Sequence, residues 1–119
     1  MRRAIENVGT FYQKGDYWEC VPESFPEVLI TLDTPSISQA QELRAQRVCA
    51  SWERIVSLCM RFIEERRTAT GLGARQFASP HVIIGANDWT VFFETESDVE
   101  VDVGVEFRDD VPFQLVIGD

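Results

Sequence analysis

The residues with the clearest chemical character are carboxylates that recur at alternate positions near the end of the chain. The acids in this pattern are Glu94, Glu96, Asp98, Glu100, Asp102 and Glu106. Because successive side chains of a β-strand point to opposite faces, this spacing predicts that the acids share one face of two neighbouring strands. We name it the acidic sheet face. A cluster of carboxylates attracts cations. The candidate cations are a metal ion, a proton and the basic groups of another protein.

The net charge of the chain is concentrated in the same region. Residues 88–119 hold ten acids against one base, Arg108, and therefore carry the whole formal charge of −9, while residues 1–87 are neutral. A surface of one sign favours a cationic partner. With a single lysine, Lys14, and an acidic balance, the chain is not expected to bind nucleic acid directly.

Four hypotheses compete for the acidic sheet face. The first is a solvated face that resists aggregation, and the second is a binding site for a basic protein. The third is a calcium site, and the fourth is a mimic of nucleic acid that occupies the basic groove of a nuclease. The calcium hypothesis is weakened because Gly104 comes one residue too late for an EF-hand loop that begins at Asp98. We favour the basic protein partner, and Phe92 on the same face supplies an exposed aromatic anchor.

A long helix is expected before these strands, from near Ser36 to about Arg67, because neither Gly nor Pro intervenes before Gly71. Its apolar residues recur at steps of three and four. They are Ala45, Val48, Cys49, Trp52, Ile55, Val56, Cys59, Phe62 and Ile63.

Three arginines on this helix recur every seven residues, opposite the apolar residues. We name Arg47, Arg54 and Arg61 the arginine ridge. The ridge is either a solvated face with local partners, such as Glu65 for Arg61, or a secondary interaction face that meets the acidic sheet face of another copy.

The remaining apolar segments predict strands. They are a hairpin over 7–13 and 17–21, a buried strand over 28–32, and later strands over 81–85, 89–96, 99–108 and 113–117. A turn near Ser97 would place Glu94 opposite Glu100. At 119 residues the chain suits a single domain, 1–119. The expected fold is α+β, a mainly antiparallel curved sheet of about five to seven strands with one long amphipathic helix on one face.

Other chemistry has little support in the sequence. The single histidine, His81, has no recognisable catalytic neighbours, and the cysteines Cys20, Cys49 and Cys59 form no metal-binding or redox motif. We therefore expect no catalytic residue, metal or cofactor, and a small enzyme or ligand-binding domain that uses His81 is the least favoured alternative. Without a membrane-spanning stretch or an export signal, the expected location is the cytoplasm.

The layout of the chain resembles the small acidic immunity proteins of bacterial toxin systems. The resemblance lies in Tyr17-Trp18-Glu19-Cys20, the strand over 28–32, the arginine-studded helix, and strands that start at Trp89 and end at 113–119. It implies a non-enzymatic inhibitor that binds a cognate toxin domain, often a nuclease. No functional residue is carried over, because these families use many folds. The alternative is a structural or self-associating subunit, and the oligomeric state is open.

Overall fold

The computed structural model describes residues 1–66, 76–96 and 102–118, which form one sheet and two helices. The elements in chain order are β1 (Arg2–Ile5), β2 (Gly9–Gln13), β3 (Trp18–Cys20), β4 (Leu29–Leu32), α1 (Gln39–Ala50), α2 (Trp52–Glu65), β5 (Gln76–Ile84), β6 (Trp89–Glu96), β7 (Asp102–Arg108) and β8 (Val111–Gly118). The mixed α+β class fits. The expected five to seven strands and single long helix are wrong, because the described residues form eight strands and two helices.

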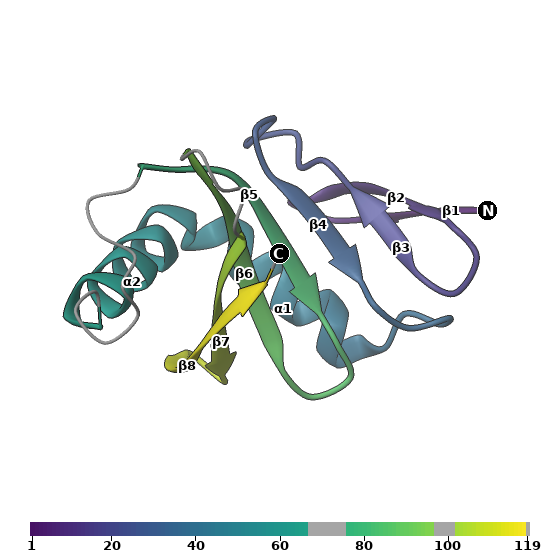
Figure 1. The fold of residues 1–119 in the computed structure, drawn as a ribbon. Helices are drawn as coiled ribbons and strands as arrows, with labels where there is room; N and C mark the ends of the chain where they lie inside the picture. Colours follow the sequence, from purple (N-terminus) through teal and green to yellow (C-terminus); the bar gives the residue numbers. More distant parts are fainter. Residues whose placement is uncertain (67–75, 97–101, 119) are drawn as a thin grey trace.

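The strands lie in the sheet in their sequence order, β1 to β8. Neighbouring strands are antiparallel except β4 and β5, which are parallel. A parallel pair needs a long crossover, and the two helices provide it. The sheet therefore consists of two four-stranded antiparallel meanders, β1–β4 and β5–β8, which pair in parallel at its centre (Figure 1).

The predicted helix is interrupted at Ser51, where φ is −125° and ψ is 25°. It begins at Gln39, and Ser38 caps it while the Gln41 side chain accepts a hydrogen bond from the Ser38 backbone N–H. No Gly or Pro lies near Ser51, so the sequence contains no residue that typically interrupts a helix at this position. Serine is a weak helix former, and the break lets α1 pack on β5 while α2 packs on β7 and β8.

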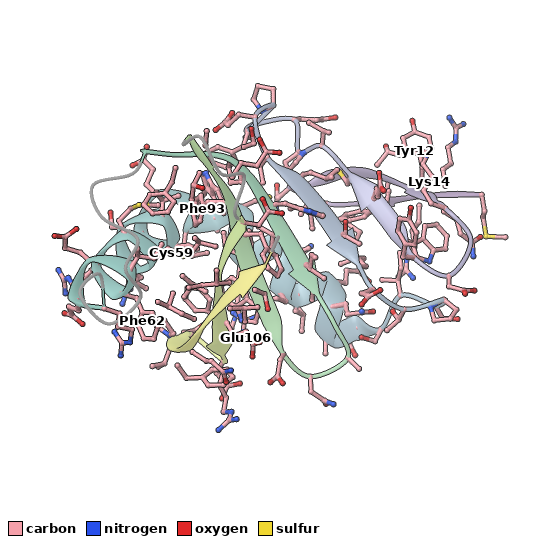
Figure 2. The ribbon with its side chains drawn as sticks, in the orientation of Figure 1. Tyr12, Lys14, Cys59, Phe62, Phe93 and Glu106 are labelled. Atoms are coloured by element: carbon pink, nitrogen blue, oxygen red, sulfur yellow. The ribbon has the colours of Figure 1, made fainter. Side chains whose placement is uncertain are left out.

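The predicted apolar residues of the two helices pack on one face of the sheet. Seven of them are buried, Ala45, Val48, Trp52, Ile55, Cys59, Phe62 and Ile63, while Cys49 and Val56 are partly exposed. Phe93 of β6 belongs to the same core cluster as Cys59 and Phe62 of α2 (Figure 2). The core therefore lies between the helices and one face of the sheet.

Two strand predictions were incomplete. β1 was missed, and its link to β2 is a tight turn in which Asn7 (φ 66°) and Gly9 (φ 148°) have left-handed backbone angles. β5 begins five residues before His81, at Gln76, and crosses a bulge between Ala78 and His81. Pro80 lies in that bulge, a position where a missing ladder hydrogen bond is tolerated.

Candidate functional site

The second face of the sheet carries no helix from the described residues, and Figure 1 shows the molecule from that side, with α1 behind the strands. The strand pairing places one row of facing residues across this outer face. The row runs Tyr12, Glu19, Thr31, Ile83, Thr90, Glu106 and Gln114. A second row contains Leu29, His81, Phe92, Gly104 and Val116. The outer face therefore mixes acids with apolar and aromatic side chains.

The acids predicted for this face are placed there where the structure describes them. Glu94 of β6 and Asp102 of β7 are both exposed and face each other across neighbouring strands, and Glu106 lies between Thr90 and Gln114. Glu96 continues β6, where its backbone pairs with Gln76. Its side chain, like Asp98 and Glu100, lies outside the described residues.

The predicted register between these strands was wrong by two residues. Glu94 faces Asp102 rather than Glu100, and residues 97–101 between the strands lie outside the described residues. A shift of two residues keeps every side chain on its face. The acidic sheet face therefore survives the correction, with a different pair of carboxylates opposed.

The observed register places Phe92 in close contact with Gly104. A Cβ atom added to Gly104 would lie 2.6 Å from Cε1 and 2.8 Å from Cδ1 of Phe92, so the ring occupies the space that a side chain would fill. Phe92 is on the outer face as predicted, but it is partly buried rather than exposed. It is thus an aromatic group already fixed by its neighbour.

His81 lies on the outer face beside Phe92, which the sequence did not indicate. Its Nε2 atom is 2.8 Å from Oγ1 of the buried Thr31. Burial lowers the pKa of His81 below its usual 6.5, while the carboxylates of Glu19 and Asp102 act in the opposite direction. The parallel pairing of β4 with β5 brings these groups together, and long-range pairing has no local sequence signal.

Four arginines of the described residues form ion pairs with acids that lie away from the outer face. These ion pairs are Arg3–Glu42, Arg44–Asp110, Arg47–Asp110 and Arg66–Glu65. None of them involves Glu94, Asp102 or Glu106. The described acids of the outer face are therefore not neutralised by an ion pair within the described part of the chain.

The arginine ridge lies on the helix layer, on the other side of the sheet. Arg47, Arg54 and Arg61 are exposed there. Arg47 also approaches Asp110 in the turn between β7 and β8, with its Nη1 atom 3.8 Å from Oδ2. The ridge and the acidic sheet face are therefore separate surfaces, although one acid near the end of the chain reaches the ridge.

The thiols are not activated. All three cysteines are free, and burial raises the pKa of Cys20 to about 11 and that of Cys59 to about 12. A nucleophile or soft metal ligand needs the thiolate form. The described residues contain no group of three or more His, Cys, Asp and Glu side chains that could hold a metal ion.

No helix in the described part of the chain is long and apolar enough to cross a membrane. Comparison of the chain with models of protein families, with curated proteins and with solved structures gives no match.

Proposed function

We propose that the protein is a non-enzymatic inhibitor that binds a basic surface of another protein through its outer sheet face. The observation that carries this proposal is the exposed pair Glu94 and Asp102, opposed across two strands with no ion-pair partner among the described bases. Like charges directly opposite each other destabilise a sheet, by up to about 1 kcal/mol. A cationic partner removes that penalty when it binds.

The neighbours of the pair support a binding role. Phe92 packs over Gly104 beside the pair, and Ile83, which lies farther along the outer face opposite Thr90, is partly exposed. Interfaces combine ordered aromatic anchors with a charged surround, and a side chain that is already ordered loses less entropy on binding. Opposite charges then speed the encounter, and the aromatic anchor slows release.

The resemblance to small acidic immunity proteins suggests a finer form of the proposal, in which the partner is a bacterial toxin domain. Size, charge and element order support it. In this form the acids of the outer face engage the cationic groove with which the toxin binds its own substrate, and binding blocks that groove.

The test compares two double charge reversals that change the net charge equally. Glu94→Lys/Asp102→Lys alters the outer face. Glu6→Lys/Glu53→Lys is the control, since both residues are exposed and lie with the helix layer, where Gln46 of α1 donates to the Glu6 carbonyl. A protein captured by the wild type is identified, and its association rate with each variant is measured over a range of salt concentrations.

We expect the outer-face reversal to slow association on the order of tenfold at low salt, with the difference shrinking as salt rises. The control should change the rate much less. Equal effects of the two double variants would show that only net charge matters. An unchanged rate for a folded Glu94→Lys/Asp102→Lys protein would remove this face from the interface.

A further inference from the structure

A pocket of about 320 Å³ lies on the helix side of the molecule, between the junction of α1 with α2 and the turn that joins β7 to β8. Three guanidinium groups line it, those of Arg44, Arg47 and Arg54, and the side chains of Ile55 and Leu58 give it an apolar wall. Pockets for small molecules begin at about 300 Å³. The volume therefore suits a small ligand and leaves no room for a folded partner.

The charges in this pocket do not balance. Asp110 is the one acid among its lining residues, and its Oδ1 atom accepts a hydrogen bond of 2.8 Å from Nη1 of Arg44. The same carboxylate is 3.8 Å from Arg47. Among the described residues, one carboxylate faces three arginines, which leaves two positive charges in the pocket without an acid partner.

Arg44 is oriented by its surroundings. Its guanidinium lies 4.9 Å from the centre of the Trp89 ring, and its side chain is only 15% exposed. Trp89 is buried, stacks on Phe107 at 4.1 Å and donates from Nε1 to the Asp109 carbonyl at 2.8 Å. One cationic wall of the pocket is thus rigid, which lowers the entropy cost of binding an anion.

The break between the helices adds a polar side chain to the pocket. Ser51 lines the pocket, and its side chain does not cap α2. The Ser51 hydroxyl is a further hydrogen-bond donor at the same wall.

We propose that this pocket binds the phosphate group of a small phosphate monoester. A monoester carries about −1.5 to −2 charges at neutral pH, which matches the two unpaired arginine charges, whereas a carboxylate carries one. Planar guanidinium groups bind phosphate oxygens in pairs. Ile55 and Leu58 receive the organic part of the ligand. The net charge of −9 repels long polyanions, so the ligand is a small molecule rather than a nucleic acid.

The proposal is tested by calorimetric titration of the full chain at low ionic strength with phenyl phosphate, inorganic phosphate and benzoate. We expect phenyl phosphate to bind on the order of tenfold more tightly than benzoate, because it supplies a second charge to the arginines. It should also bind more tightly than inorganic phosphate, because its phenyl ring packs against the apolar wall. Equal affinities for phenyl phosphate and benzoate, or no heat from phenyl phosphate at millimolar concentration, overturn the proposal.

Variants locate the site. Arg54→Gln should weaken phenyl phosphate binding about tenfold. Arg61→Gln is the matched control, since it removes the same charge from the same helix at a residue that does not line the pocket. Asp110→Asn should tighten binding, because it removes the competing carboxylate, and a misfolded protein would not show that gain. Equal losses for the two arginine variants, or weaker binding by the Asp110 variant, refute the site.

Discussion

Replacement of Gly104 by alanine tests the geometry on which the acidic sheet face depends. The added Cβ would lie 2.6 Å from the Phe92 ring and 3.1 Å from Cγ2 of Thr90, so the ring has to move. Overpacking typically costs about 1–3 kcal/mol. Phe92 is partly exposed and can shift towards water, which places the cost near about 1.5 kcal/mol.

Part of that cost is offset, because alanine loses less conformational entropy than glycine in a strand, by about 0.5–1 kcal/mol. We therefore expect Gly104→Ala to lower the free energy of unfolding by about 1 kcal/mol, and the melting temperature by about 3–5 °C for a domain of this size. Urea and thermal denaturation followed by circular dichroism measure both quantities.

Two comparisons isolate the contact. Gly118→Ala is the matched control in β8, because an added Cβ there meets no atom within 4 Å, and it should be neutral or slightly stabilising. In a Phe92→Ala background the ring is absent, so Gly104→Ala should become neutral or stabilising. The double-mutant cycle then gives a coupling of about 1.5 kcal/mol between the two positions.

The opposite result would refute the register. If Gly104→Ala and Gly118→Ala are equally stable and the cycle shows no coupling, the Phe92 ring does not lie on Gly104. The same pairing sets Glu94 opposite Asp102. The opposed carboxylates, and the binding proposal that rests on them, would then be withdrawn.

Three further predictions concern single side chains. Gln41 is buried and donates to the carbonyl of Ile84 at 3.3 Å, so Gln41→Leu should cost about 2 kcal/mol in urea denaturation, and a loss below about 0.5 kcal/mol would contradict this role. Hydrogen bonding from Arg44 lowers the pKa of Asp110 below 3.8, so its small contribution to stability is present above that pH and is lost as pH falls through the folded-state pKa. Asp110→Asn should be slightly less stable than wild type at neutral pH, the difference should shrink as pH falls below 3.8, and a difference that does not change with pH would contradict this role. Burial lowers the pKa of His81, so its contribution to stability is complete above pH 6.5 and declines as pH falls from 6.5 through the folded-state pKa. His81→Gln should flatten the pH dependence of the denaturation midpoint below pH 6.5, and an unchanged slope would contradict it.

The sequence predicted the parts of the fold that follow from local periodicity. Steps of three and four residues identified the buried side of the helices, including Val48 and Ile55, and alternation identified the two sides of β6 and β7. The break at Ser51 was missed because helix signals rely on Gly and Pro, whereas here the sheet that the helices cover sets the direction of each.

The features that the sequence did not predict depend on contacts between residues that are far apart in sequence or between paired strands. β1 contains Arg2 and Arg3 and has no alternating apolar pattern, so only its pairing with β2 makes it a strand. The position of His81 beside Thr31 depends on a parallel pair whose members are 50 residues apart in sequence. Such contacts depend on how the whole sheet assembles, and no short window of sequence encodes them.

The sequence placed the negative charge in one region, and the structure divides that region between two surfaces. Glu94 and Asp102 stand on the outer sheet face, while Asp110 crosses to the helix side and meets Arg44. The arginines therefore retain surplus charge even though the chain as a whole is strongly acidic. Under our two proposals, the outer face binds a cationic protein, and the pocket on the helix side binds a small anion. Because the two surfaces lie on opposite sides of one sheet, reversals at Glu94 and Asp102 should leave phenyl phosphate affinity nearly unchanged at physiological salt, where charges far beyond about 8 Å are screened.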